Sequence, residues 1–447
     1  KKYVEIPSYQ HLCTKNNIFY VDNLHFRDIF DIFLLGDNMK VYNRENYLQK
    51  IRGFYDDPET IKVITGIRRC GKSFLLEMVK NELRAKGIKD ENIIDIKLDK
   101  RPYKGIKNPE QLEKLIDSLI NIKGFKYLFI DEIQNVKNFE PVIEAFRNEG
   151  NISIFITGSN SYLLSGELVT KLTGRKIEIE MLPLTFNEYV EMKKFYKKEI
   201  NPNIYLEFQE FIRNGGFPGA IKFDNIEDKN RYIQNIISDI FTKDIRPNKK
   251  IKNKELFNSI QTFVINNFGS MISVSSISKY YENIGRNIDD RTIENYLEIL
   301  ESAKILYKCE AFDLKSKETL KGEKKYYLAD TSIYFSQNTD NRVNYGPVLE
   351  NILHNYLLSK DYKLSVGKIG SLECDFIARK GNENYYYIQV SKNIENDETE
   401  EREYRPFYQI RDMYPRYMFL MDFIINKNVD GVKNVNIVDF IVNNEEL

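Results

Sequence analysis

The sequence has few of the residues that build metal clusters. Its 447 residues include 3 His and 4 Cys. Cys13, Cys70, Cys309 and Cys374 are far apart and form no C-x-x-C pair, which excludes a cysteine-based zinc site and is typical of a reducing compartment. His11, His25 and His354 are equally separated, so we expect each to be structural and expect no metal cluster.

Long apolar runs and a charge excess are also missing. No run approaches the length of a membrane span, and no secretory signal pattern is found, so we expect a cytoplasmic protein with no membrane partner. Lys and Arg total 66, and so do Asp and Glu. The net charge therefore neither favours nor excludes a nucleic-acid partner. With 42% hydrophobic residues, a chain of this length is expected to fill several cores.

One short stretch carries the functional interpretation. After the apolar strand Val63–Thr65, the sequence reads G-x-x-x-x-G-K-S from Gly66 to Ser73, which is the Walker A or P-loop pattern. Gly66 and Gly71 lack a Cβ, so the backbone can fold around a phosphate, and the helix that follows offers its N–H groups. Lys72 is expected to neutralise the β- and γ-phosphates of ATP, and the Ser73 hydroxyl to bind Mg²⁺. The residues expected to contact the nucleotide are Gly66, Ile67, Arg68, Arg69, Cys70, Gly71, Lys72, Ser73 and Phe74.

A second apolar strand ends in two acidic residues. Residues 127–130 are apolar or aromatic and precede Asp131 and Glu132, as in a Walker B strand that is buried on both faces of a parallel sheet. Asp131 is expected to hold Mg²⁺, and Glu132 to orient and activate the attacking water as the catalytic base. Asp-Glu pairs are common on surfaces, but this pair follows a buried strand and a P-loop.

Further candidates are polar residues near the ends of the later strands. Ser159 and Asn160 follow the next buried strand, and either could sense the γ-phosphate. Arg175 lies on a loop from which an arginine can reach the γ-phosphate of a neighbouring subunit; a local salt bridge is the alternative. Tyr42 and Arg44, which precede the P-loop strand, are candidates for bordering an adenine ring, with plain surface positions as the alternative.

These segments resemble a known family. GIRRCGKS, YLFIDEIQ, ITGSNS, LTGR and PLTFNEY, in this order, resemble the prokaryotic AAA-type P-loop ATPases that carry a winged helix and a C-terminal PD-(D/E)XK nuclease-like domain. The resemblance implies an additional-strand core, in which the Walker B strand is not adjacent to the P-loop strand. It also implies that Glu132 is the catalytic base and that Ser159 or Asn160 is the sensor.

The alternation of strands and helices over residues 61–182 predicts an α/β fold with a parallel, doubly wound sheet. We expect the nucleotide at the carboxyl ends of its strands. The predicted divisions are an N-terminal extension (1–38), the P-loop core (39–185), a helical lid (186–250), a winged helix (251–338) and a nuclease-like domain (339–447). Met39 begins the first convincing segment, so we interpret the residues before it as an extension; a swapped or docking arm is the alternative. If residues 186–250 form a lid that closes on the nucleotide, they would exclude water from it. The alternative is a helical subdomain with no switching role.

The predicted winged helix carries basic residues that could contact phosphates of DNA. They are Arg286, Arg291, Lys315, Lys317, Lys321, Lys324 and Lys325. Acidic neighbours, among them Asp289 and Glu294, dilute this positive surface. The alternative is an adaptor between domains that contacts no DNA.

The last domain matches the nuclease pattern only in part. Glu350 and Asp375 stand where the pattern has a helix Glu and a strand Asp, but Gln389 and Ser391 occupy the positions of an acid and a Lys. Gln is a poor Mg²⁺ ligand, and Lys392 would point to the opposite face of its strand. We therefore predict a nuclease-like fold without nuclease activity.

The combined prediction is an ATPase that hydrolyses ATP to ADP with Mg²⁺ and couples hydrolysis to a conformational change acting on a DNA or protein partner. The first alternative is a nucleotide-gated DNA or protein sensor with slow hydrolysis. The second is an ATP-dependent nuclease, which would depend on Glu350 and Asp375 alone. The P-loop and Arg175 also suggest a homo-oligomer.

Overall fold

The structure, a computed structural model, describes residues 41–120, 124–158, 174–246, 251–338, 342–381, 385–394, 397–422 and 430–447. The expected N-terminal extension, residues 1–38, and the sensor candidates Ser159 and Asn160 lie outside these residues. Tyr42–Leu447 form one unit of the chain.

A five-stranded parallel sheet contains the P-loop strand. Its strands are β1 (Ile61–Gly66), β2 (Ile93–Lys97), β3 (Lys126–Asp131), β4 (Ile152–Thr157) and β5 (Lys176–Met181). They are arranged in the order β2-β3-β4-β1-β5, and each neighbouring pair is parallel. Because β4 lies between β3 and β1, the predicted separation of the Walker B strand from the P-loop strand is confirmed, as is the parallel α/β fold.

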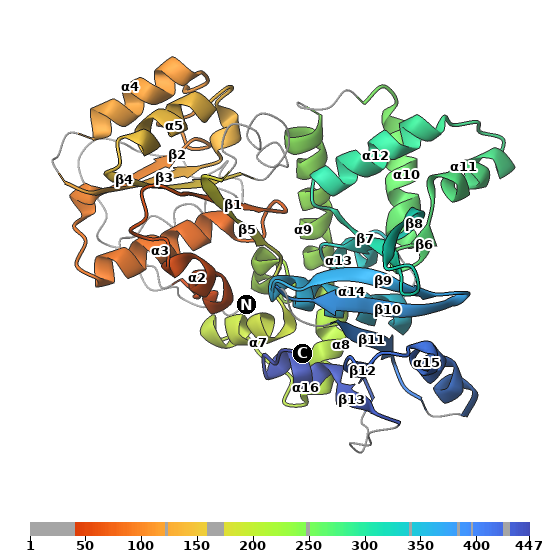
Figure 1. The fold of residues 1–447 in the computed structure, drawn as a ribbon. Coiled ribbons are helices and arrows are strands. Elements are labelled where there is room, and N and C mark those ends of the chain that lie inside the picture. The colour runs from red at the N-terminus through yellow and green to blue at the C-terminus, as the bar shows by residue number, and fades with distance from the viewer. Residues whose placement is uncertain are drawn as a thin grey trace, which may run out of the picture. The chain divides into compact units, whose positions relative to one another are not determined.

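Helices cover both faces of this sheet. In Figure 1, α2 (Glu45–Arg52) and α3 (Lys72–Ala85) lie on one face, and α4 (Pro109–Leu119) and α5 (Glu140–Asn148) lie on the other. Every residue of β1, β3 and β4 is buried, as expected for strands between two helical layers. Short 3₁₀ turns, η1 (Asp90–Asn92) and η2 (Ile133–Asn135), precede β2 and follow β3. This packing fixes the strand ends at which the P-loop and Walker B residues lie.

A helical segment follows β5. It contains α7 (Phe186–Phe195), α8 (Ile204–Asn214), the 3₁₀ turn η4 (Pro218–Lys222), α9 (Ile226–Asp239) and a π-helical turn, η5 (Ile240–Ile245). A capping box begins α7, in which the Thr185 and Glu188 side chains satisfy free backbone N–H groups, which stabilises the first turn of a helix. Between α8 and η4 runs the loop that starts at Gly215, referred to below as the GGFP loop (residues 215–218).

The remaining helices and strands are given in chain order. First come α10 (Lys254–Asn266), β6 (Met271–Ile272), α11 (Val274–Asn283), α12 (Asp290–Ser302), β7 (Leu306–Asp313), β8 (Glu318–Leu328) and α13 (Ser332–Phe335). Then follow α14 (Tyr345–Ser359), β9 (Lys363–Ile369), β10 (Leu372–Arg379), β11 (Tyr386–Ser391), α15 (Asp397–Gln409), β12 (Arg416–Leu420), β13 (Val432–Asn436) and α16 (Ile437–Val442).

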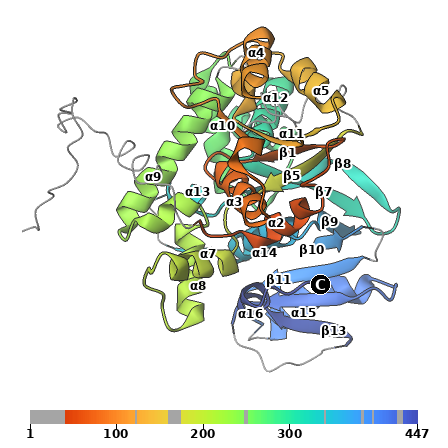
Figure 2. The same cartoon turned by 90° about the vertical axis from the view of Figure 1, so that its left-hand side faces the viewer.

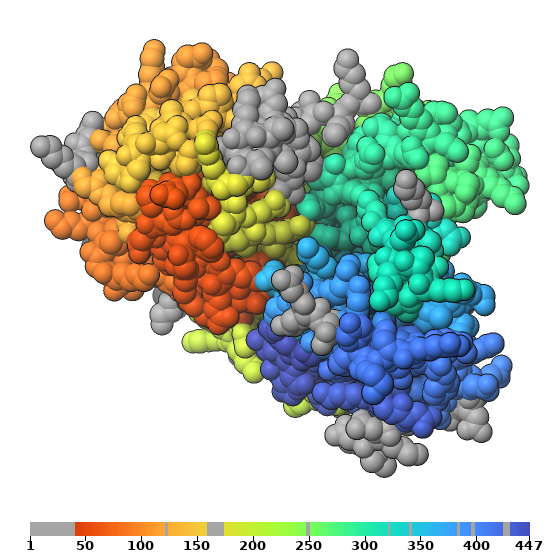
Figure 3. Space-filling model, viewed as in Figure 1, coloured from red at the N-terminus to blue at the C-terminus, as the bar shows by residue number. Residues whose placement is uncertain are grey.

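The second sheet crosses the predicted boundary at residues 338/339. Its eight strands have the order β13-β12-β11-β10-β9-β7-β8-β6, which can be followed from β7 and β8 to β13 in Figure 2. The joining pair is β7 with β9, which are parallel. In the space-filling view, the surface around β7 and β8 continues directly into that of the C-terminal residues (Figure 3). The predicted winged helix and nuclease-like domain thus share one sheet, and their division stays a prediction.

Candidate nucleotide-binding site

Backbone geometry makes the P-loop dependent on glycine. Gly66 ends β1 with φ +134°, and a Cβ at this position would lie 2.1 Å from the carbonyl oxygen of Met181 on β5. Gly71 has φ +114° and directly precedes α3. Such angles are strained for residues that have a Cβ. The tight turn that the sequence predicts is therefore possible only with glycine at these positions.

Lys72 is folded back onto the loop that it follows. It is 5% exposed, and its Nζ donates to the carbonyl oxygens of Gly66 at 2.9 Å and Ile67 at 3.0 Å. Both acceptors are neutral, so a phosphate placed at the loop would offer the ammonium group a stronger, charged acceptor.

The other predicted P-loop contacts differ in exposure. Ile67 and Cys70 are fully buried, so only their backbone can face a ligand. Arg69 and Ser73 are exposed and Phe74 is half-buried. Arg69 also has a left-handed backbone, with φ +70°.

The Walker B acid and the P-loop serine meet across β4. Asp131 is 4% exposed and accepts a hydrogen bond from the Thr157 hydroxyl at the end of β4. The pKa of Asp131 is raised to about 6, because burial and the nearby Glu132 raise it by more than the hydrogen bonds from Thr157 and Ser73 lower it. A buried carboxyl with a raised pKa is one that a cation would stabilise in its charged form.

The donor set fits a magnesium ion. A carboxylate from Asp131 and a hydroxyl from Ser73 are the oxygen ligands that Mg²⁺ prefers, and Mg²⁺ usually keeps several waters and takes few protein ligands. Both residues lie at the edge of the sheet where β1 and β3 end, because β1, β4 and β3 run parallel.

Glu132 has a left-handed backbone conformation, which is unusual for a residue other than glycine. Its φ is +58°, a region that non-glycine residues rarely adopt and that is often found at functional sites. Its backbone N–H donates to Thr157 Oγ1 at 3.0 Å, and its carboxylate accepts a hydrogen bond from Gln134. Thr157 and Gln134 were not identified from the sequence. Thr157 is the last residue of the apolar strand β4, and Gln134 follows the apolar strand β3.

Arg175 forms the local salt bridge that was the alternative to an arginine finger. Its Nη1 lies 2.6 Å from Glu144 Oε1, and the two side chains are 49% and 30% exposed. Action on a neighbouring subunit stays a prediction.

A bidentate ion pair joins the P-loop to the helical segment. Arg68 donates from Nε to Asp244 Oδ2 at 2.8 Å and from Nη2 to Asp244 Oδ1 at 2.6 Å. Asp244 is 5% exposed and lies in the π-helical turn η5, a conformation that is frequent at functional sites. The two residues are 176 positions apart, so no local pattern could have paired them.

Arg44 is buried beside the P-loop and donates a hydrogen bond to its backbone. It is 2% exposed, which makes a plain surface position, the alternative to bordering an adenine ring, wrong. It pairs with Glu188 at 2.6 Å and donates to the carbonyl oxygens of Cys70 at 3.1 Å and Leu182 at 2.8 Å. The guanidinium is thus bound within the protein, between α2, the P-loop and the start of α7.

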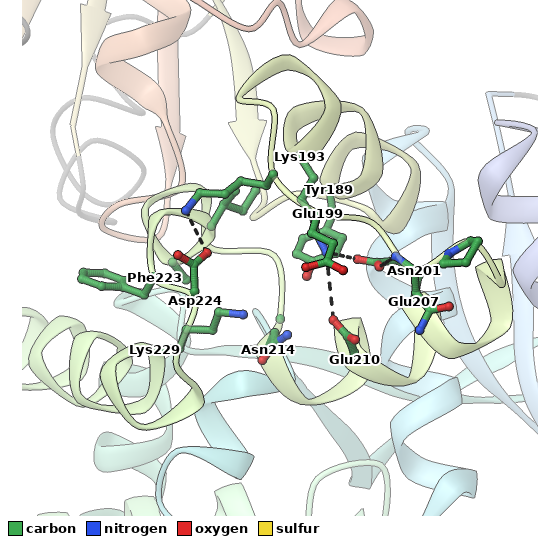
Figure 4. A pocket seen from close by; sticks show the side chains of 15 residues that line it. Tyr189, Lys193, Glu199, Asn201, Glu207, Glu210, Asn214, Phe223, Asp224 and Lys229 are labelled. Atoms are coloured by element: carbon green, nitrogen blue, oxygen red, sulfur yellow. Dashed lines mark hydrogen bonds and ion pairs between the residues drawn. The ribbon is translucent and has the colours of Figure 1, made fainter.

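A separate polar cavity of about 270 Å³ lies in the helical segment. Figure 4 shows Lys193 between Glu207 and Glu210, with which it forms ion pairs. Lys198 pairs with Asp224 at 2.9 Å. Since these charges are paired within the wall, we assign the cavity no part in nucleotide binding.

The C-terminal acids of the nuclease pattern are also brought together. Glu350 on α14 and Asp375 on β10 both lie near Lys325 Nζ, at 2.8 Å and 3.6 Å. Among the residues that the structure describes, no group of three or more His, Cys, Asp or Glu side chains is arranged to hold a metal ion.

No described helix is both long and apolar enough to cross a bilayer.

Comparisons with known proteins identify two domains. Residues 58–190 match the model of an AAA domain, and residues 205–342 match a domain of unknown function, DUF8612. Among solved structures, the Walker-type ATPase of Pyrococcus abyssi aligns with 66% of this chain and 95% of its own, at 15% identity and a TM-score of 0.48.

Two relatives match over most of the chain. An uncharacterized protein of Haemophilus influenzae is 33% identical over 402 residues, covering 90% of this chain and 98% of the relative. An uncharacterized protein of Methanocaldococcus jannaschii is 30% identical over 431 residues, covering 92% and 90%. The chain therefore belongs to the family of these two proteins, and within it residues 58–190 form an AAA-type P-loop ATPase domain.

Proposed function

We propose that this protein binds ATP with Mg²⁺ at residues 66–73, hydrolyses it, and uses the cycle to change its own conformation against a partner. The observation that carries the proposal is the meeting of Ser73 and Asp131 beside the P-loop lysine, at the ends of β1 and β3. The match of residues 58–190 to an AAA domain supports it.

Each residue has a distinct role in this proposal. The backbone N–H groups of residues 67–73 bind the phosphates, and Lys72 exchanges its carbonyl acceptors for the β- and γ-phosphate oxygens. Ser73 and Asp131 hold Mg²⁺, which when bound neutralises charge on the phosphate oxygens. Glu132 takes the proton of the attacking water, and Ser159 or Asn160 senses the γ-phosphate.

Arg175 extends the proposal to a homo-oligomer. Its ion pair with Glu144 is exposed on both sides, and exposed pairs contribute about 1 kcal/mol or less. Little energy therefore opposes its transfer to the γ-phosphate of a neighbouring copy. Particle size measured with and without a non-hydrolysable ATP analogue tests this step, because assembly should depend on the analogue and weaken in Arg175→Ala.

Contacts between segments offer a route for coupling. Arg68 and Asp244 connect the P-loop to η5. On β5, Glu180 accepts a hydrogen bond from Tyr307 at 2.9 Å and pairs with Lys304 at 2.8 Å. Asp330, which follows β8, accepts a hydrogen bond from the Gly216 N–H at 2.6 Å. A change at the nucleotide can thus reach both the helical segment and the second sheet.

Duplex DNA is the partner class that the exposed basic residues support. Arg286, Arg291, Lys315 and Lys317 are exposed on and around α11, α12 and the β7–β8 hairpin. Lys325, by contrast, is 3% exposed, so its predicted phosphate contact is wrong. Binding of duplex DNA that weakens with salt, and weakens further in Arg291→Ala, would support DNA; binding independent of salt and of Arg291 would favour a protein partner.

Calorimetric titration with a non-hydrolysable ATP analogue and Mg²⁺ tests the central step. Loss of a charge-assisted contact costs about 1.5–3 kcal/mol, so Lys72→Ala should bind roughly 10- to 100-fold more weakly. Lys86→Ala is the matched control, because Lys86 is exposed just after the same helix. Equal binding by the parent protein and Lys72→Ala would refute the assignment.

A further inference from the structure

Three carboxylates from two elements converge on one buried ammonium group. Lys325 on β8 is 3% exposed. Its Nζ lies 2.8 Å from Glu350 Oε2, 2.7 Å from Glu373 Oε1 and 3.6 Å from Asp375 Oδ1. Glu350 belongs to α14, whereas the other two acids belong to β10. The cluster therefore ties β8 to two elements of the C-terminal part.

The acids are held in place independently of the lysine. Tyr327 donates to Glu350 Oε2 at 2.8 Å, the Val390 N–H donates to Asp375 Oδ2 at 2.8 Å, and Lys368 Nζ lies 3.1 Å from Glu373 Oε2. Glu373 and Asp375 each turn their other oxygen toward Lys325, whereas Glu350 Oε2 accepts from both Tyr327 and Lys325. Carboxylate oxygens are the ligands that a hard divalent cation takes, but with Lys325 among them these three acids are not arranged to hold one.

Burial favours a cation at this point. Glu350 and Asp375 are 8% and 9% exposed, and burial raises the pKa of both carboxyl groups while Lys325 lowers it. The carboxylates in turn raise the pKa of Lys325. Uncompensated buried charges are costly, and the ammonium group supplies the compensation.

Gln389 does not complete the cluster. Its Oε1 accepts a hydrogen bond from the backbone N–H of Asp375 at 2.6 Å, and its Nε2 donates to Glu403 at 3.2 Å. Both ends of the amide are therefore engaged away from Lys325. A carboxylate at this position would have added a ligand; the amide adds none.

We propose that Lys325 is a built-in counter-ion that fills the position where Glu350, Glu373 and Asp375 would otherwise take a divalent cation. The cluster is a latent cation site, closed by the protein's own lysine, and it fastens β8 to α14 and β10 without metal. This inference concerns the second sheet alone and does not depend on ATP binding.

Removing the lysine should open the site. Lys325→Ala removes the charge and leaves space for a cation, whereas Lys325→Met removes the charge but fills most of the space. Lys324→Ala is the matched control, because Lys324 is the adjacent residue, with its Nζ lying over the ring of Tyr326 at 6.0 Å. All variants carry Asp131→Asn, so that binding at the P-loop does not contribute.

The experiment titrates Mn²⁺ into each full-length variant, follows free Mn²⁺ by electron paramagnetic resonance, and records thermal unfolding with and without the ion. We expect Lys325→Ala to bind about one more Mn²⁺ per chain than the Asp131→Asn parent and to unfold at a higher temperature with Mn²⁺. This gain should be absent in Lys324→Ala, smaller in Lys325→Met, and lost when Asp375→Asn is added to Lys325→Ala.

Two results would overturn the proposal. One is Mn²⁺ binding by the Asp131→Asn parent that disappears on adding Asp375→Asn, since the site would then be open despite Lys325. The other is Lys325→Ala binding no additional Mn²⁺. If Lys325→Ala is unfolded without metal, Mn²⁺ should restore its circular dichroism spectrum, and failure to do so would count against the proposal equally.

Discussion

Asp330 offers a quantitative test of the contact between the GGFP loop and the end of β8. Its carboxylate is 5% exposed and accepts hydrogen bonds from the Gly216 N–H at 2.6 Å and the Ser332 N–H at 3.0 Å. Burial raises the pKa of Asp330 from its ordinary value of 3.8 to about 6, although these hydrogen bonds lower it. Between about pH 4 and pH 6 the native state therefore binds a proton more tightly than the unfolded chain. The contribution of Asp330 to the stability of the protein therefore falls as the pH rises through this window.

The expected size follows from the two pKa values. Their difference corresponds to about 3 kcal/mol of unfolding free energy, and Asp330→Asn removes this dependence. Burial lowers the pKa of His354 to about 4, which makes stability rise with pH in the same window. His354 is present in both proteins, so the difference between parent and variant cancels its effect.

Urea unfolding at several pH values between 4 and 7 measures this difference. We expect the free energy of unfolding of the parent, relative to Asp330→Asn, to decline by about 2.5 kcal/mol from pH 4 to pH 7. Asp117→Asn, at an exposed position on α4, is the control for replacing a carboxylate by an amide. A constant difference for Asp330→Asn would refute the account of this buried carboxyl.

Three further predictions concern the nucleotide site. Gly66→Ala should abolish binding of ATP and lower the unfolding temperature, because its Cβ would meet a carbonyl oxygen at 2.1 Å; Gly53→Ala, where the Cβ meets nothing within 4 Å, should do neither. Arg68→Ala and Asp244→Ala should each reduce ATP turnover, and the double variant should be no worse than the poorer single one; additive losses would show that the ion pair does not act as a unit. Arg44→Ala should lower the free energy of unfolding by about 3–5 kcal/mol, because it leaves a buried carboxylate unpaired; urea unfolding measures this loss, and a change under 1 kcal/mol would contradict it.

The sequence was most informative where chemistry is local. The P-loop pattern fixes its own turn, because Gly66 and Gly71 meet steric conditions that few other residues satisfy. The apolar run before Asp131 predicts a buried strand with Asp131 at its carboxyl end, and every residue of β3 is buried. The family resemblance implies that the Walker B strand is not adjacent to the P-loop strand, and the structure confirms this separation.

Contacts between distant segments could not be predicted in this way. Arg68 occupies one of the x positions of the G-x-x-x-x-G-K-S pattern, and none of its sequence neighbours indicates a contact with Asp244. Lys325 reads as one of several basic residues on a hairpin, yet the pairing of β7 with β9 brings its strand beside the C-terminal acids. Such partners depend on tertiary packing, which periodicity and spacing do not specify.

The hydrolysis rate of Glu132→Gln at saturating ATP and Mg²⁺ tests the central claim most directly. A catalytic base typically contributes about 10²- to 10⁴-fold to the rate, so turnover should fall by at least about 100-fold while the affinity for ATP stays within a few-fold of the parent value. Hydrolysis at the parent rate would contradict the proposed mechanism.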